Sequence, residues 1–480
     1  MSSSPDIQPP PGVVELREDI PLKPSSRSLA GSRLCGGGPR VIIGAFAVLT
    51  VAITIALLTQ IYYGDYEVVP HGSVSSSAAA CSRAGTAVLR AGGAAPDAAA
   101  AAALCLAVLA PHRTSLDASG SLVHWEYRQS RTMLPTTAVW GADGTVGLSV
   151  GGNSSVTRPP RLVAALAALH ARLGLLPWEQ VLQPAIDLAR TGYVVSASLS
   201  AAAAARGLPG YTPTALRTEP ALADYLESLK NYTSSELCAL WSCAGAVRWE
   251  AAAAGAAAGA WRVWAAGAGG ALATAALRAA LAPGSTPASA LQTAVQSLQT
   301  QAQAAGARWP RGVAAGLAVV DPRDTYVALV TGLSTPFGSD LSDGPEAWSR
   351  DEPAAPLDLA PAIITDQHIC GTRYVVGGES GIALAQAAAV ALSGAVAGAA
   401  DAVEAARVLV LPGGSLAAEP GRAPGLPPPG PPPAGPPPPG PPGLPAANDT
   451  VLPAVNFVQQ KGDALLSHAD SRGEGLASRF

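Results

Sequence analysis

The longest apolar segment of the chain lies near its N-terminus. Residues 41–63 form a run of 23 residues without a charged side chain. A helix of this length crosses the roughly 30 Å hydrocarbon layer of a bilayer, and Tyr62 and Tyr63 at its end are typical of the membrane interface. The 40 residues before the run are more than precede the apolar part of a cleavable signal peptide. We therefore predict one transmembrane signal-anchor helix.

Charged residues on the two sides of this run predict its orientation. Basic residues lie on its N-terminal side, at Lys23, Arg27, Arg33 and Arg40. The C-terminal side begins with Asp65 and Glu67. The positive-inside rule then keeps the N-terminus in the cytosol. The sequence predicts a single-pass type II membrane protein whose larger part is extracellular or lumenal.

Helical patterns follow beyond residue 78. A 12-residue apolar stretch ends at Leu109, after Asp97, which we expect to act as the N-cap. It is too short to span a bilayer, so it predicts a buried core helix. Residues 162–175 and 178–189 have the spacing of amphipathic helices. The Ala- and Gly-rich residues 251–282 are expected to form a weakly specified helix rather than a second span, because alanine and glycine insert poorly into membranes.

Strand patterns concentrate in the second half of the chain. Residues 316–320 and 326–330 flank a turn at 321–324, the pattern of a β-hairpin. Residues 374–376 are expected to form a strand that leads, through Gly-Gly-Glu-Ser-Gly, into an apolar helix ending at Leu392.

The remaining segments have biased compositions. Residues 1–40 predict a disordered cytosolic tail, and residues 64–77 a short stalk. Residues 411–446 predict a proline-rich linker that acts as a spacer, followed by a C-terminal segment at 447–480.

Composition excludes several classes of function. Only 13% of residues are charged and the formal net charge is -4, so the chain lacks the basic surface that binds nucleic acid. Its six histidines show no zinc-ligand spacing. We expect no nucleic-acid partner and no metal site.

Two residue types agree with a lumenal or extracellular location. Three of the four asparagines, Asn153, Asn231 and Asn448, begin N-glycosylation sequons. Five of the six cysteines also lie beyond the apolar run. Cys238 and Cys243 could close a short disulfide loop, whereas Cys105, in an apolar helix, is expected to be a buried thiol.

Several separated blocks resemble the γ-glutamyltransferase family, in the family's order. They are residues 91–99 with Ala110-Pro111-His112, residues 176–178 with 183–195, residues 360–364 with 375–381, and the segment 311–339 that ends in Phe337-Gly338-Ser339. The resemblance covers about residues 41–410. It implies an α/β fold, the N-terminal nucleophile hydrolase αββα sandwich, behind the transmembrane helix.

The family relationship also implies a chemistry. Members cleave the γ-glutamyl bond of glutathione and its conjugates and transfer the group to water, an amino acid or a peptide, without a cofactor. They mature into a heavy and a light chain, which here correspond to residues 78–310 and 311–410. The light chain of the family begins with the nucleophilic threonine, whose own α-amino group acts as the base.

The catalytic positions of the family are poorly matched. The nucleophile position falls on Ala314, and the segment between Thr300 and Thr325 has no Ser, Thr or Cys. A histidine position falls on Gly316, and a pair of serines falls on Leu357 and Asp358. The oxyanion glycines fall on Ser380 and Gly381, which we expect to line the substrate site, and Arg131 could replace the arginine that binds the donor carboxylate.

Three hypotheses follow. An active γ-glutamyl hydrolase would have to use another nucleophile, and Thr325 and Thr331 are the nearest hydroxyls. A catalytically inactive pseudoenzyme would act as a binding or partner subunit, with a related active subunit, glutathione or γ-glutamyl peptides as candidate partners. A structural glycoprotein outside the family would leave the ordered blocks unexplained. The residues themselves favour the pseudoenzyme, which predicts an uncleaved chain.

Overall fold

The computed structural model describes residues 38–63, 71–129, 133–141, 159–251, 255–339, 348–353, 355–366, 371–419 and 451–480. The chain divides into two compact units, Met1–Val68 and Val69–Phe480. In the first unit, helix α1 (Gly38–Tyr63) contains the predicted apolar run. Residues Arg40–Gln60 of this helix are long and apolar enough to cross a membrane. The helix prediction is thus confirmed.

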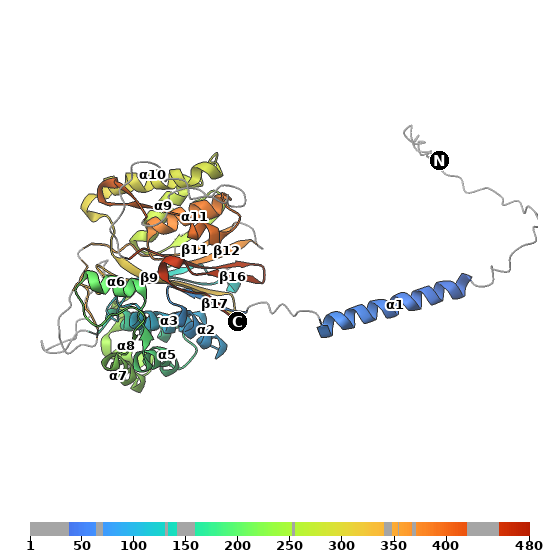
Figure 1. Cartoon of the computed structure of the whole chain (residues 1–480), viewed down its shortest axis with the longest axis horizontal. Helices are drawn as coiled ribbons and strands as arrows, with labels where there is room; N and C mark the ends of the chain where they lie inside the picture. The colour runs from blue at the N-terminus through green and yellow to red at the C-terminus, as the bar shows by residue number, and fades with distance from the viewer. Residues whose placement is uncertain are drawn as a thin grey trace, which may run out of the picture. The chain divides into compact units, whose positions relative to one another are not determined.

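The second unit has four layers, with two antiparallel sheets packed face to face between helices (Figure 1). The first sheet has the order β17-β1-β9-β10-β2-β3-β6 and the second has the order β16-β15-β12-β11-β8-β7. The strands of the first sheet are β1 (Ser73–Ser76), β2 (Ser119–Glu126), β3 (Thr136–Trp140), β6 (Arg248–Ala251), β9 (Val313–Val320), β10 (Thr325–Leu333) and β17 (Ser478–Arg479).

The second sheet contains β7 (Ala256–Ala258), β8 (Trp261–Ala265), β11 (Ala360–Asp366), β12 (Thr372–Gly378), β15 (Val455–Lys461) and β16 (Ala464–His468). Two small ribbons pair β4 (Tyr193–Val194) with β5 (Leu216–Arg217) and β13 (Val408–Val410) with β14 (Leu416–Ala418).

Helices cover both outer faces of the sheets (Figure 1). On the first sheet lie α2 (Ala79–Arg90), α3 (Ala95–Leu109), α4 (Arg161–Leu173), α5 (Trp178–Thr191), α6 (Ala197–Ala205), α7 (Pro220–Ser228) and α8 (Ser234–Trp241). On the second lie α9 (Gly267–Ala280), α10 (Pro287–Ala305), α11 (Gly381–Ser393) and α12 (Ala399–Glu404). Short 3-10 helices are η1 (Tyr127–Gln129), η2 (Leu229–Asn231), η3 (Cys243–Gly245), η4 (Gly306–Arg308), η5 (Pro412–Gly414) and η6 (Ser471–Gly473).

Alternating side chains of the strands form the core between the sheets. Ala318 and Tyr326 of the first sheet pack against Ile363 and Val375 of the second, and all four side chains are buried. This arrangement is the αββα sandwich of N-terminal nucleophile hydrolases, which confirms the expected fold.

The two sheets approach each other closely at a pair of glycines. A β-carbon placed on Gly316 of β9 would clash with the carbonyl oxygen of Gly377 of β12, and one on Gly377 would clash with the backbone of Leu317. Side chains are therefore excluded at both positions. The histidine that the family pattern puts at residue 316 has no room here.

The carboxylate of Asp97 joins two of the family-like blocks. It lies inside α3 as its third residue and accepts hydrogen bonds from the backbone N–H groups of Ala94, Leu175 and Leu176, at 2.9 to 3.2 Å. The N-cap of α3 is Ala94, so the prediction that Asp97 is the cap is wrong by three residues. The carboxylate still satisfies N–H groups at the helix start, as an acidic residue in a capping box does.

Two other predicted segments are corrected by the structure. Residues 256–265 form a hairpin, β7 and β8, instead of a helix, because Gly259 adopts a positive φ of 60° at the turn and Val263 and Trp264 are buried in the sheet. Only residues 267–280 of the segment are helical. Residues 411–419, assigned to the linker, form η5 and β14, since the hairpin with β13 satisfies their backbone.

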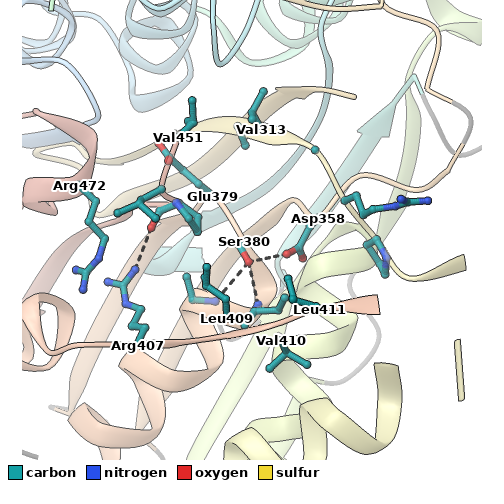
Figure 2. Close-up of a pocket in the computed structure, with 18 of the residues that line it drawn as sticks. Val313, Asp358, Glu379, Ser380, Arg407, Leu409, Val410, Leu411, Val451 and Arg472 are labelled. Atoms are coloured by element: carbon teal, nitrogen blue, oxygen red, sulfur yellow. Dashed lines mark hydrogen bonds between the residues drawn. The ribbon is translucent and has the colours of Figure 1, made fainter. Parts of the chain in front are cut away.

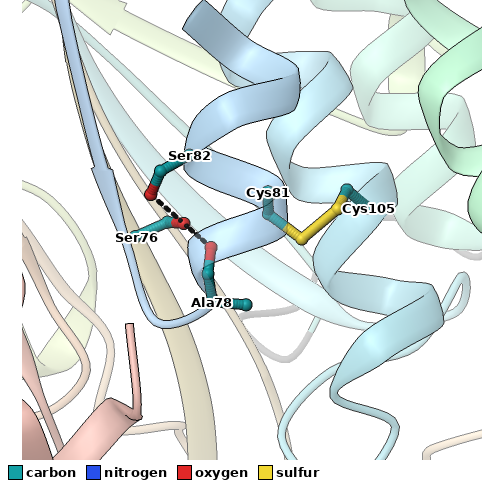
Figure 3. The surroundings of a disulfide bond; sticks show 5 residues. All are labelled: Ser76, Ala78, Cys81, Ser82 and Cys105. Atoms are coloured by element: carbon teal, nitrogen blue, oxygen red, sulfur yellow. Dashed lines mark hydrogen bonds between the residues drawn. A yellow bond between two sulfur atoms is a disulfide. The ribbon is translucent and has the colours of Figure 1, made fainter. Parts of the chain in front are cut away.

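The cysteines pair differently from the prediction. Cys81 of α2 and Cys105 of α3 form a disulfide (Figure 3). The prediction that Cys105 is a buried free thiol is therefore wrong. The two helices pack against each other and bring both cysteines into one buried cluster. Cys238 and Cys243 are free thiols in the structure and share a hydrogen bond. The loop disulfide between them is not formed. Cys370 lies outside the described residues.

We predict that the disulfide between Cys81 and Cys105 stabilises the second unit. The two cysteines are separated by 24 residues in the sequence. Cross-linking a loop of this size lowers the conformational entropy of the unfolded chain and so raises the free energy of unfolding by about 3 kcal/mol. Replacing both cysteines with alanine should lower the free energy of unfolding by about this amount in urea denaturation. Cys238→Ser, a free and half-buried thiol, should change it by less than about 1 kcal/mol. Equal stability with and without the disulfide would contradict this role.

Candidate functional site

A cleft of about 340 Å³ opens at the N-terminal end of β9. Its walls come from the start of β9, the segment before β11, the start of α11, the β13–β14 ribbon and residues 451–453 (Figure 2). Ala314, on the family's nucleophile position, lies in this wall and is 4% exposed. The structure therefore places the residue expected at the catalytic centre in a cleft.

Hydroxyl groups are scarce in this cleft. Among the described residues that line the cleft, Ser380 is the one with a hydroxyl group, and none is a threonine or a cysteine. Thr331 is fully buried, and its hydroxyl shares a 2.8 Å hydrogen bond with the hydroxyl of Thr114. Thr325 is also buried, at the start of β10. Neither of these alternative nucleophiles lines the cleft.

Asp358 binds the groups that correspond to the family's oxyanion glycines. The backbone N–H of Gly381 donates to Oδ1 of Asp358 at 2.9 Å. The hydroxyl of Ser380 donates to Oδ2 at 2.5 Å (Figure 2). Ser380 is also the N-cap of α11, since its Oγ accepts from the N–H groups of Ile382 and Ala383. The carboxylate thus occupies the start of α11, where helix geometry favours an anion.

Burial affects the ionisation of this carboxylate. It raises the pKa of Asp358 to about 6, although the hydrogen bonds from Ser380 and Gly381 oppose the shift. Loss of hydration is the larger effect, because the carboxyl group is enclosed by α11, Gly269 of α9 and the β11 end of the sheet.

An ion pair between Arg113 and Glu379 forms the inner wall of the cleft. The guanidinium Nη1 lies 2.5 Å from Oε2 of the carboxylate, and both side chains are almost completely buried. Glu379 also accepts from the N–H groups of Gly316 and Ala454 and from the hydroxyl of Ser77. Both charges are therefore paired within the protein.

A second buried charge cluster lies beside the first. Arg407 pairs with Asp470 at 2.6 Å, and Arg472 pairs with Asp470 at 3.0 Å and with Glu419. The buried arginines of the cleft thus each have a carboxylate partner from the chain. Arg311, at the rim, is exposed and has no ion pair in the part of the chain that the structure describes.

Comparison with known proteins shows a family similarity over part of the chain. Residues 81–236 match the model of the gamma-glutamyltranspeptidase family. Glutathione hydrolase 7 from Bos taurus is 32% identical over 216 residues, which are 41% of this chain and 32% of that protein. Glutathione hydrolase 6 from Homo sapiens is 34% identical over 180 residues, 35% of this chain and 34% of that protein.

Over these residues the chain is similar to the γ-glutamyltransferase family. The matched segments span about a third of the length of these relatives. The fold is also found in solved structures of low sequence identity. Cephalosporin acylase from Bacillus halodurans superimposes with a TM-score of 0.62 at 15% identity, covering 86% of this chain and 96% of the acylase. A structure titled LmbA2991HD gives a TM-score of 0.61 at 15% identity, with 86% and 98% covered.

The site residues predicted from the sequence are not all brought together by the structure. Ala314 and Ser380 line the same cleft, and the N–H of Gly381 is bound at its edge. Arg131, Asn153 and Asn448 lie outside the described residues. Asn231 is exposed at the end of η2, and the thiols of Cys238 and Cys243 are not part of the cleft.

The charged residues of the cleft were missed by the sequence interpretation. Arg113 directly follows the Ala-Pro-His block, and Glu379 lies within Gly-Gly-Glu-Ser-Gly. A charge inside a block that otherwise predicts buried backbone is a usable signal, because buried charges need a partner. In the described residues no group of three or more His, Cys, Asp and Glu side chains could hold a metal ion.

We predict that Asp358 makes stability fall as pH rises from about 4 to about 6. Its pKa is about 6 in the folded chain and 3.8 for an ordinary aspartate, so the folded state binds more protons in this window and loses stability as the carboxyl group ionises. The loss is on the order of 3 kcal/mol. The natural chain should therefore lose stability relative to the Asp358→Asn variant as pH rises through this window. Above the window, the difference in unfolding free energy between the two proteins should stay constant. A difference that does not change with pH would contradict the burial of the carboxylate.

Proposed function

We propose that this chain is a membrane-anchored, catalytically inactive member of the γ-glutamyltransferase family that acts as a binding or partner subunit. The observation that carries the proposal is Ala314 at the nucleophile position of the cleft, with Ser380 as the one hydroxyl among the described lining residues. A methyl group cannot attack a carbonyl carbon, and covalent catalysis has no substitute for a nucleophile.

Ser380 is poorly suited to replace the threonine. Its hydroxyl proton is donated to Asp358, and its oxygen accepts two backbone N–H groups as the cap of α11. These bonds hold the oxygen at the helix start and take up its lone pairs. Attack on a substrate would break the cap and leave the N–H groups of α11 without acceptors.

The stabilisation of an oxyanion is also compromised. The donor that corresponds to the oxyanion site, the N–H of Gly381, is bound to Asp358. A negative oxygen that develops on a substrate would have to displace a carboxylate and would then lie close to it. Oxyanion donors contribute several kcal/mol to acyl transfer when they are free and preorganised, so their occupation supports loss of activity independently of Ala314.

The charges of the cleft are mostly paired with one another, which argues against turnover of a γ-glutamyl substrate. The α-amino and α-carboxylate groups of a γ-glutamyl substrate need a carboxylate and a cation that are free to pair with them. Arg113, Arg407 and Arg472 are already paired, and Arg311 at the rim is the cation left for an acidic ligand among the described lining residues. Glutathione and γ-glutamyl peptides, the substrates of the family, are the first ligands to test, and a related active subunit is the alternative partner.

The topology proposed for the chain is type II. Helix α1 would cross the membrane once, with residues 1–40 in the cytosol as a tail, and the second unit would be extracellular or lumenal. The stalk predicted at residues 64–77 is wrong in its last part, because Ser73–Ser76 form the buried strand β1 of the first sheet. Residues 78–310 and 311–410 correspond to the heavy and light chains of the family, here in one polypeptide. The disulfide between Cys81 and Cys105 supports an oxidising compartment.

We predict that the purified full-length chain does not release the anilide from a γ-glutamyl anilide. Loss of a catalytic nucleophile costs on the order of 10⁶-fold in rate. Ala314→Thr should also be silent, because Asp358 still occupies the N–H of Gly381. Material purified in the same way from cells without the chain measures contamination by other enzymes. Saturable turnover by the natural chain above that background would contradict the proposal.

Glycosylation of Asn231 tests the topology. The residue is exposed and heads a sequon whose Thr233 caps α8, so Asn231→Gln should remove one glycan, seen as a mobility shift that glycosidase treatment of the natural chain reproduces. Thr233→Ser is the matched control, because serine keeps both the sequon and the helix cap. A natural chain whose mobility neither Asn231→Gln nor glycosidase changes would contradict a lumenal second unit.

A further inference from the structure

Apolar side chains that are not buried form much of the wall of the cleft at the start of β9. They come from β9, α11, the β13–β14 ribbon and residues 451–453, and include Val313, Ile382, Leu409, Leu411, Val451 and Leu452. Val313 and Val451 lie on one side of Ser380 in Figure 2. Leu409 and Leu411 lie on the other side (Figure 2). A cleft of about 340 Å³ with such walls has the size and the lining of a small-molecule site.

The charges inside the cleft are unfavourable for an anionic group of a ligand. Arg113, Arg407 and Arg472 are paired with carboxylates of the chain. Asp358 has no cationic partner among the described residues and lies against the start of α11, where it is 9% exposed. An anion placed at α11 would therefore lie beside a carboxylate whose charge is not compensated by a cation.

Arg311 offers a free cation at the rim of the cleft. Its backbone is fixed, because its N–H donates to the carbonyl oxygen of Pro356 at 3.1 Å and its own carbonyl oxygen accepts from the N–H of Asp358 at 3.2 Å. Its side chain is exposed and has no ion pair in the part of the chain that the structure describes. A guanidinium group at the mouth of an apolar cleft favours a ligand with a carboxylate at one end.

We propose that the cleft binds a monocarboxylate with an apolar tail. The carboxylate would pair with Arg311 at the rim, and the tail would lie inward, against Leu409, Leu411 and Val451. The reverse orientation would place the carboxylate beside Asp358. Glutathione carries two carboxylates and an ammonium group, and the apolar walls give such charges no partner. This inference rests on the function proposed above, because it names the class of ligand for the cleft of an inactive binding subunit.

A series of acids tests the apolar walls. Butanoate, hexanoate and octanoate are titrated into the full-length chain in detergent at pH 7.5, and binding is measured by calorimetry. The affinity should rise about fourfold with each methylene group until the cleft is filled, because each buried methylene leaves water. Titration of protein-free micelles measures the uptake of each acid by the detergent and is subtracted.

Comparison of octanoate with octan-1-ol tests the carboxylate. Octanoate should bind about fivefold more tightly to the natural chain, because an ion pair with an exposed arginine has roughly this effect. Arg311→Gln should remove the difference between the two ligands and leave the affinity for octan-1-ol unchanged. Arg278→Gln, an exposed arginine on α9 outside the cleft, is the matched control and should change neither affinity.

A change in the apolar wall locates the tail of the ligand. Leu411→Ser should weaken the binding of octanoate about fivefold, because part of the apolar contact is lost. Leu411 is 36% exposed, so the substitution leaves the core of the protein intact. Leu466→Ser, on β16 and 47% exposed, lies outside the cleft and should leave the affinity unchanged.

Four results would overturn the inference: none of the three acids binds saturably, octanoate binds no more tightly than butanoate, octan-1-ol binds as tightly as octanoate, or Leu411→Ser has the affinity of the natural chain. Tighter binding of glutathione than of octanoate would also overturn it, and would leave the proposal of an inactive binding subunit in place. Turnover of a γ-glutamyl anilide, measured on the same preparation, would instead contradict the function proposed above.

Discussion

The buried ion pair between Arg113 and Glu379 connects the parts of the second unit that surround the cleft. Arg113 donates to the carbonyl oxygen of Ala314, and Glu379 accepts from the N–H groups of Gly316 and Ala454. The pair therefore joins the loop after α3, the first residues of β9, the end of β12 and the C-terminal segment. Removing one partner would leave an unpaired buried charge, which typically costs 3–5 kcal/mol. This constraint keeps the inner wall of the cleft in place.

Internal pairing of charges would let this fold persist in the catalytically inactive chain proposed above. Asp358, Glu379 and Asp470 bind donors that lie around the cleft, and each of these contacts also stabilises a helix start or a strand end. In an active site without substrate, some polar groups have no partner within the protein, and this lowers the stability of the fold. In this chain the groups are satisfied by one another, so fold and cleft remain while the reacting positions are occupied.

The sequence predicted those elements whose local pattern agrees with their tertiary environment. The hairpin of β9 and β10, the amphipathic helices α4 and α5 and the apolar helix α11 are examples. It failed for β7 and β8, because a strand paired in a sheet tolerates alanine and glycine that favour other structures in isolation. The disulfide between Cys81 and Cys105 and the contact of Asp358 with Gly381 depend on residues brought together by the fold, and spacing along the chain contains little information about them.

The length of the mature polypeptide tests the central claim most directly. In the family, the nucleophile becomes the N-terminus of the light chain when it cleaves the peptide bond before it, and Ala314 cannot perform that attack. Intact mass measurement and N-terminal sequencing of the purified, deglycosylated full-length chain should give one polypeptide that spans residues 313 and 314. A fragment that begins at or near residue 314 would contradict the claim, because it would require a working nucleophile in the cleft.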